Sequence, residues 1–233
     1  MRFAMRFSAV AAVLATLALL AAPQPADARS PEYRREYHVS VAGSDDNDGS
    51  MAKPLKTISA AAKLAQPGET VIVHPGTYRE RVNPPRGGTS EAKHISYVAA
   101  DGENPAIISG SEVVTGWKKA DNGLWTVTLP NSFFGDYNPY KDQIHGDWFN
   151  ANRRVHHTGE VYLDANALAE EVSLEKAAAR PMSWFCQTDD ANTTLWANFG
   201  DAEPAKANVE INVRPTCFYP DQTGRNYILV RGF

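Results

Sequence analysis

Apolar and polar side chains first alternate regularly over residues 37–41, YHVSV, which predicts a half-buried strand. The acidic run 43–49, bounded by glycines, cannot continue a strand and predicts a turn. Apolar residues at helical spacing over 55–65 predict a short helix, which a Pro-Gly pair ends. A short apolar strand over 70–73 follows, so strand, helix and strand succeed one another within one stretch.

The next part of the chain continues with short strands and turns. Further strands are predicted over 77–82, 94–99 and 106–108. Val71 and Ile95 lie 24 positions apart, which suits one coil of a parallel β-helix, although no strict repeat accompanies the spacing. Residues 29–112 would then form an N-terminal cap and the first coils, with the helix over 55–65 covering the open end.

The pattern changes over residues 113–214, where longer alternating strands are joined by turn-rich segments. The predicted strands are 123–129, 161–163, 184–186, 194–199 and 209–213. Short strands bounded by Gly, Pro and Asp are typical of an antiparallel sandwich, and the third and fourth strands predict a hairpin. An Ala- and Glu-rich stretch over 167–179 predicts a short surface helix. Residues 215–233 then predict a return to the β-helix, with a buried strand over 227–233.

Residues 1–28 have the features of a cleaved signal peptide. Two arginines precede an apolar run over 10–22 that is too short to span a membrane, and the small residues at 26–28 fit a cleavage site. We therefore expect a secreted or periplasmic protein that begins near Arg29 and has no membrane span after cleavage. Without this segment, 23 basic and 27 acidic residues become 21 and 26, a net charge of −5. No basic stripe occurs, which argues against nucleic acid as a partner.

The most unusual segment is 131–140, which carries four aromatic residues broken by Gly and Pro. An aromatic ring can stack on the apolar face of a sugar, and a carboxylate accepts hydrogen bonds from sugar hydroxyl groups. Tyr140, at the end of this segment, is therefore a candidate substrate-binding residue. Asp147 and Trp148, which follow the segment closely, are candidates for the same reason. The alternative is that the aromatic residues fill the seam between two domains, which we favour for the Phe-Phe pair of this segment.

No cofactor and no metal site are predicted. Aligned on Gly49 as a calcium loop, the acidic run has Ser44 and Leu55 at the first and last ligand positions, so a solvated turn is the better interpretation. The adjacent residues His156 and His157 would point to opposite faces of a strand and could not share one metal ion.

The chain has two cysteines, Cys186 and Cys217, which lie 31 positions apart. Export allows a disulfide between them. By the chain-entropy estimate such a bond contributes roughly 3–4 kcal/mol to stability. Two buried thiols are the alternative interpretation.

Several sequence segments resemble known proteins. YHVSVAGSDDNDGS, followed by KPLKTISAAAKLAQPGETVIVHPGTYRE, resembles the N-terminal cap of the pectate-lyase-like β-helix proteins. With LPNSFFGDYNPYKDQIHGDW, VEINVRPTCFYP and YILVRGF, the chain from Tyr37 to Phe233 resembles glycoside hydrolase family 120, the β-helix β-xylosidases. The resemblance implies an all-β fold: the start of a right-handed parallel β-helix, a short N-terminal capping helix and an inserted antiparallel β-sandwich-like domain.

The resemblance also implies an activity. The family removes xylose from short β-xylosides with retention, using an aspartate nucleophile and a glutamate acid/base about 5–5.5 Å apart. It places both carboxylates beyond Phe233, so no catalytic residue is assigned here. We expect the N-terminal part of a secreted retaining β-xylosidase, inactive as this fragment, with an exposed strand edge and with xylo-oligosaccharide or a related glycoside as its partner.

Two other functions stay open at this point. A pectate-lyase-like polysaccharide lyase would need a calcium site and a basic residue to remove the C5 proton, and neither is evident in the sequence. A non-catalytic sugar-binding surface module needs no catalytic pair. The fold alone does not choose among the three, because one scaffold supports many chemistries.

The first prediction concerns export. Because the features of residues 1–28 fit a cleaved signal, mass spectrometry of the exported protein should find an N-terminus at Arg29. Mature protein that retains Met1 would contradict the prediction.

Overall fold

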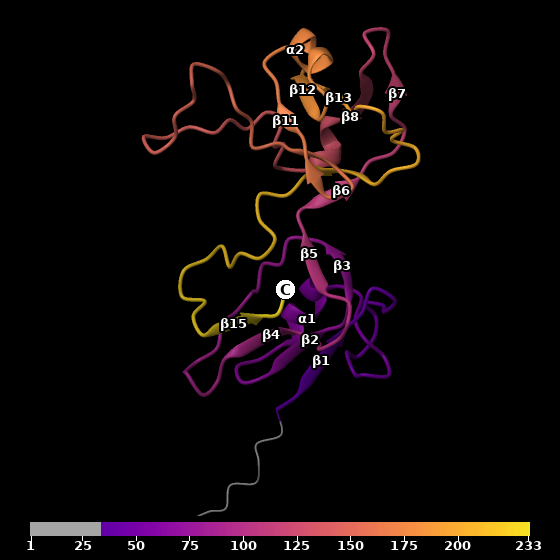
Figure 1. Ribbon diagram of the computed structural model, residues 1–233. Helices are drawn as coiled ribbons and strands as arrows, with labels where there is room; N and C mark the ends of the chain where they lie inside the picture. The colour runs from indigo at the N-terminus through magenta and orange to yellow at the C-terminus, as the bar shows by residue number, and fades with distance from the viewer. Residues whose placement is uncertain (1–33) are drawn as a thin grey trace, which may run out of the picture. The chain divides into compact units, whose positions relative to one another are not determined.

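The computed structural model describes residues 34–233, and the expected signal peptide lies outside the described residues. Strands dominate this part of the chain, accompanied by two short α-helices and one 3-10 helix (Figure 1). The all-β prediction is therefore confirmed. No helix within residues 34–233 has the length and apolar character that crossing a membrane requires.

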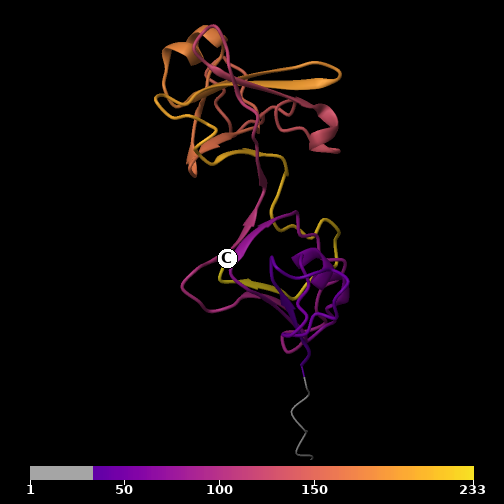
Figure 2. The ribbon, with the colours of Figure 1, turned by 90° about the vertical axis from the view of Figure 1, so that its right-hand side faces the viewer.

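A parallel sheet forms from segments at both ends of the described chain. Its strands, in spatial order, are β1 (Glu36–Val39), β2 (Thr70–Val73), β4 (Ile95–Ala99) and β15 (Ile228–Arg231). Figure 2 shows the yellow C-terminal strand running beside the strands of the N-terminal part. A second parallel pair joins β3 (Gly76–Arg79) and β5 (Ala106–Ser109).

The strand register differs from the spacing predicted between the parallel strands. Val71 lies opposite Tyr97, 26 positions away, rather than opposite Ile95 at 24. Because side chains alternate with a period of two, a difference of two residues leaves the same face pointing inward. Ile95 and Tyr97 are both fully buried, so the alternation alone could not distinguish the two registers.

The inward face of the parallel sheet packs on helix α1 (Ile58–Leu64), which is shorter than the predicted 55–65. Two carboxylates satisfy the backbone N–H groups at and before its start. Asp45 Oδ1 accepts from the backbone nitrogens of Lys56 and Thr57, at 2.9 and 2.8 Å. Glu80 accepts from the backbone nitrogens of Ile58 and Ser59, both at 2.8 Å. The acidic turn thus holds the helix start, where unpaired N–H groups favour negative charge.

Residues 111–212 form two mainly antiparallel sheets. One has the order β10-β9-β14-β6 and the other β11-β12-β13-β8-β7. Their strands are β6 (Ser111–Val113), β7 (Lys118–Lys119), β8 (Trp125–Pro130), β9 (Val161–Leu163), β10 (Asn166–Ala167), β11 (Ala169–Glu170), β12 (Ser183–Thr188), β13 (Asn192–Asn198) and β14 (Val209–Asn212). The predicted hairpin is confirmed by the antiparallel pairing of β12 with β13. One apolar core, which includes Trp184, Leu195 and Ile211, draws on both sheets.

Two predicted elements differ from the structure. The helix expected over 167–179 is confined to α2 (Leu174–Ala179), because Ser173 caps its start and the residues before it pair as short strands. The strand expected to be buried over 227–233 is β15, which within residues 34–233 lies at the sheet edge and pairs with β4 alone. Leu229 and Val230 are consequently 44% and 43% exposed.

The second prediction tests the carboxylate at the helix start. Asp45→Ala removes three acceptor contacts, to the Lys56 and Thr57 backbone nitrogens and the Thr57 hydroxyl, and should lower the free energy of unfolding by about 1–2 kcal/mol. Asp46→Ala is the matched control, because the Asp46 side chain accepts no hydrogen bond within residues 34–233. Urea denaturation would measure both, and equal losses in the two variants would disprove the role of Asp45.

Candidate binding site

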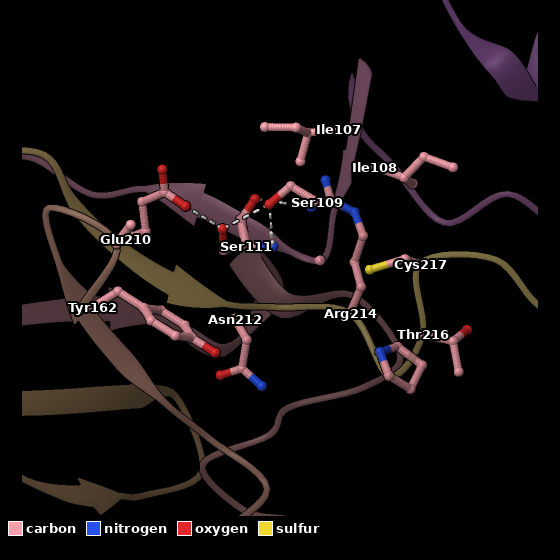
Figure 3. A pocket seen from close by; sticks show the side chains of 13 residues that line it. Ile107, Ile108, Ser109, Ser111, Tyr162, Glu210, Asn212, Arg214, Thr216 and Cys217 are labelled. Atoms are coloured by element: carbon pink, nitrogen blue, oxygen red, sulfur yellow. Dashed lines mark hydrogen bonds between the residues drawn. The ribbon is translucent and has the colours of Figure 1, made fainter. Parts of the chain in front are cut away.

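A cavity of about 420 Å³ opens where strands β5 and β6 meet strands β9 and β14 (Figure 3). Figure 3 shows Tyr162 and Asn212 on one side, and Thr216 and Cys217 on the other. Ile107 and Ile108 add apolar surface; the other lining residues are Ser109, Gly110, Ser111, Ala165, Glu210, Arg214 and Pro215. The mixture of apolar surface with hydroxyl, amide and carboxylate groups suits a small polyhydroxyl ligand.

A bidentate ion pair holds Glu210, the carboxylate that lines the cavity. Arg79, from β3, donates to both carboxylate oxygens of Glu210, from β14, at 2.7 and 3.2 Å. The same guanidinium also donates to the Ser111 carbonyl oxygen at 2.9 Å. Asn208 donates to Glu210 at 2.7 Å, and the Ser111 hydroxyl donates to it as well. The side chains of Arg79 and Glu210 are only 24% and 18% exposed, so the pair is shielded from solvent.

This geometry sets the charge of Glu210. Hydrogen bonds from Arg79 and then from Ser111 and Asn208 outweigh the effect of burial and lower its pKa to about 2. Glu210 therefore stays ionised and cannot serve as a general acid. The other described carboxyl groups with displaced pKa values, Asp48 and Asp189 among them, are also shifted downward. The cavity thus offers fixed hydrogen-bonding groups for binding and no visible acid/base pair.

Tyr162 and Asn212 add polar groups beside Glu210, because Tyr162 is its partner on the neighbouring strand β9 and Asn212 lies two residues further along β14. Burial, followed by a hydrogen bond with Glu160, raises the pKa of the Tyr162 hydroxyl, so it remains a neutral donor. Asn212 is held by the Glu160 backbone nitrogen, which donates to its Oδ1 at 2.6 Å, and its amide donates to the Thr158 carbonyl oxygen at 2.8 Å. These contacts fix both side chains before any ligand arrives.

A second hollow, of about 570 Å³, crosses the outer face of the parallel sheet. Ile72, Val98 and Leu229 line it with apolar side chains. His38 and His74 also line it, with His38 Nδ1 3.0 Å from His74 Nε2 and their rings stacked at 5.2 Å. Burial and then the neighbouring His74 lower the pKa of His38, so its imidazole is neutral at pH 7.

The three candidate substrate-binding residues are in different environments. Tyr140 is 1% exposed, and its hydroxyl donates to the Glu160 carbonyl oxygen at 2.7 Å. It is a core residue whose ring packs edge-on against Trp184, and its role in sugar binding stays a prediction. Trp148 is 79% exposed and Asp147 is exposed beside it. Their role in sugar binding stays a prediction.

Both cysteines are free thiols, so the candidate disulfide is not formed. Cys186 is buried in the core of residues 111–212, where its sulfur lies 3.9 Å from the Tyr140 carbonyl oxygen. Cys217 is exposed and lines the cavity of Figure 3. Burial raises the pKa of Cys186 to about 12, which keeps this thiol protonated.

The adjacent histidines are also placed differently from the prediction. His157 Nδ1 lies 2.6 Å from Glu170 Oε1, and His156 Nδ1 lies 3.9 Å from Glu170 Oε2. They face one carboxylate because this segment is a loop with a single bridge at His157 rather than a strand. Within residues 34–233, no group of three or more His, Cys, Asp or Glu side chains is placed to hold a metal ion.

The sequence interpretation missed Glu210, which lines the cavity, and its partner Arg79. Glu210 lies in the predicted strand 209–213 and Arg79 in the predicted strand 77–82, and neither residue was singled out. They are 131 positions apart, and nothing local connects them. No local signal marks the pair, because each residue is one of several polar positions in its predicted strand.

The chain is similar to known proteins in several parts of its sequence. A family model described as the insertion domain of glycoside hydrolase 120 matches residues 114–182 and 171–211. A second, a protein family of unknown function (DUF1565), matches residues 41–84. The uncharacterized protein YwoF of Bacillus subtilis (strain 168) is 38% identical over 76 residues, which are 33% of this chain and 16% of YwoF.

The solved structure of XylC in complex with xylose matches 85% of this chain with a TM-score of 0.81 and 38% sequence identity. The matched part is 35% of the XylC chain. These similarities are to a glycoside hydrolase insertion domain and to a protein solved with a sugar. The particular resemblance is to glycoside hydrolase family 120, and the resemblance predicted from the sequence is confirmed.

The third prediction follows from the lowered pKa of Glu210. Folding lowers the pKa of this carboxyl group from 4.5 to about 2. The ionised group therefore stabilises the folded protein at pH values above 4.5, and this stabilisation is lost as the pH falls toward about 2. Glu210→Gln should therefore cost about 2–3 kcal/mol at pH 7, and the difference from wild type should shrink between pH 4.5 and 2.

Urea denaturation at several pH values would measure the effect. Glu203→Gln is the matched control, because the Glu203–Lys206 pair is 57% and 79% exposed and should change stability by less than about 1 kcal/mol. A loss for Glu210→Gln that did not change with pH would mean that the Glu210 charge does not contribute.

Proposed function

We propose that this chain is part of a secreted glycoside hydrolase, a retaining β-xylosidase acting on short xylosides. The observation that carries the proposal is the match to XylC with xylose over 85% of this chain at a TM-score of 0.81. The chain spans about a third of XylC, at 35%, so activity and substrate belong to the proposal.

The same proposal includes the finer architecture. The parallel order β1-β2-β4-β15 and the parallel pair β3-β5 support a right-handed parallel β-helix at its first coils, with α1 as the cap. The two sheets of residues 111–212, which share one core, support a β-sandwich-like insertion. The boundaries 29–112, 113–214 and 215–233 describe this division.

In this proposal residues 34–233 bind sugar and do not cleave it. Retaining hydrolysis needs a carboxylate nucleophile and a second carboxyl group with a raised pKa. Glu210 is held ionised by Arg79, which suits hydrogen bonding to sugar hydroxyl groups but not proton donation. The proposal places the catalytic pair outside residues 34–233. A sugar-binding module without catalysis is the second candidate, and the same observation on Glu210 favours it.

The fourth prediction tests sugar binding in the cavity of Figure 3. Tyr162→Leu removes a neutral hydroxyl donor and an aromatic face, and should weaken the binding of xylose and xylobiose at least about tenfold. Tyr219→Leu is the matched control, because Tyr219 is 52% exposed and does not line the cavity. Isothermal titration calorimetry would measure both variants.

Equal affinities in wild type and the two variants would reject the cavity as the sugar site. The chain should also release no nitrophenol from nitrophenyl β-xyloside. Turnover that disappeared on mutating one acidic residue within 34–233 would show that a catalytic carboxylate lies in this part of the chain, contrary to the proposal.

A further inference from the structure

A third hollow, of about 460 Å³, is formed entirely by the loop that follows strand β8. Its lining residues come from one stretch: Asn131, Gly135, Asp136, Tyr137, Asn138, Lys141 and Asp142. The 3-10 helix η1 (Asn131–Phe134) starts this stretch, and Gly135, with φ of 63°, turns the chain out of it. A Cβ atom at Gly135 would meet nothing within 4 Å, so the space beside the turn is open.

Hydrogen bonds to strand β13 and within the loop hold the loop in place. Asn138 Nδ2 donates to the Thr193 hydroxyl at 2.8 Å and to Asn131 Oδ1 at 3.2 Å. The Thr193 hydroxyl donates to Asn131 Oδ1 at 2.8 Å and closes a triangle of hydrogen bonds. On the inner side, Phe134 and Tyr140 pack edge-on in the core. A hollow supported in this way exists before any ligand binds, which reduces the entropy lost on binding.

The rim of this hollow carries polar groups that the fold does not use. Asp136 is exposed, and its carboxylate makes no hydrogen bond or ion pair with another residue in the described chain. Lys141 is exposed, and its ammonium group donates no hydrogen bond within residues 34–233. Tyr137 is half-buried, with its hydroxyl 2.6 Å from the Thr158 hydroxyl, so its ring is held in place.

The chemistry of the rim excludes some ligands and favours one. Asp136 and Asp142 would repel an anion, while Lys141 opposes a metal cation, and no metal-binding group of three side chains occurs in residues 34–233. Sugar hydroxyl groups both donate and accept, so neighbouring carboxylate, amide and ammonium groups match them. The Tyr137 ring adds the apolar surface that a sugar ring can contact.

We propose that the loop 131–142 is a second saccharide-binding site, separate from the cavity of Figure 3, which takes a neutral oligosaccharide. The two hollows share no lining residue. The choice of a xylan-type ligand rests on the proposed function. The site itself rests on the rigid support and the unused polar groups of the loop.

The test uses the full chain, with xylotriose as the probe, and follows backbone amide signals by NMR. Titration should shift the signals of loop residues 131–142 in wild type and in Tyr162→Leu. The double variant Asp136→Ala/Lys141→Ala should lose these shifts, with at least tenfold weaker binding at the loop. Asp190→Ala is the matched control, because it removes an exposed carboxylate from a different turn. Unchanged melting temperatures would confirm that the variants fold. Trigalacturonate should bind the loop at least tenfold more weakly than xylotriose.

The outcomes separate the two proposals. Xylotriose shifts confined to the cavity residues would overturn the loop site and leave the proposed function standing. Shifts confined to the loop would support the loop site and count against the cavity as the sugar site. Absence of shifts at both places would overturn both, and equal binding of trigalacturonate would overturn the assignment of a neutral ligand.

Discussion

The contact between Arg79 and Glu210 is the interaction that fixes the carboxylate of the cavity and ties two parts of the fold together. It joins a strand of the parallel part to a strand of the segment 111–212, and it does so with two hydrogen bonds at 2.7 and 3.2 Å. A bidentate guanidinium–carboxylate pair fixes direction as well as distance, which a lysine could not do. Removing one partner would leave a partly buried charge unpaired, and such losses are among the costliest single changes in proteins.

The part of the structure that contains Arg79 is built from the parallel sheet and helix α1. Strands β2 and β4 bury alternate residues, and α1 packs on the face that these residues form. The acidic turn, which superficially suggests a calcium loop, uses Asp45 to hold the start of that helix. A carboxylate that accepts backbone N–H groups gives the helix a fixed starting point without any metal ion.

The sequence predicted those features that depend on residues close together in the chain. The β12–β13 hairpin and the all-β class follow from alternation and turn residues, because strand period and turn chemistry are short-range. Tyr140 and Trp148 show the limit of this approach: both are aromatic residues near Gly or Pro, yet one is 1% exposed and the other 79%. Burial depends on which distant segments pack against a residue. For the same reason the partner of Glu210, 131 positions away, could not be read from the sequence.

The pairing of β6 with β14 has a consequence for the history of such chains. Ser111 lies opposite Asn212 and Val113 opposite Glu210, so the long segment between them leaves and returns on adjacent antiparallel strands. The segment between β6 and β14 therefore connects two adjacent antiparallel strands, as the loop of a hairpin does. A short turn could replace it with little cost in closing the chain, and Glu210 would remain at the junction. A gene segment with this geometry can be gained, lost or exchanged as one unit, while the scaffold that receives it keeps its own strand order.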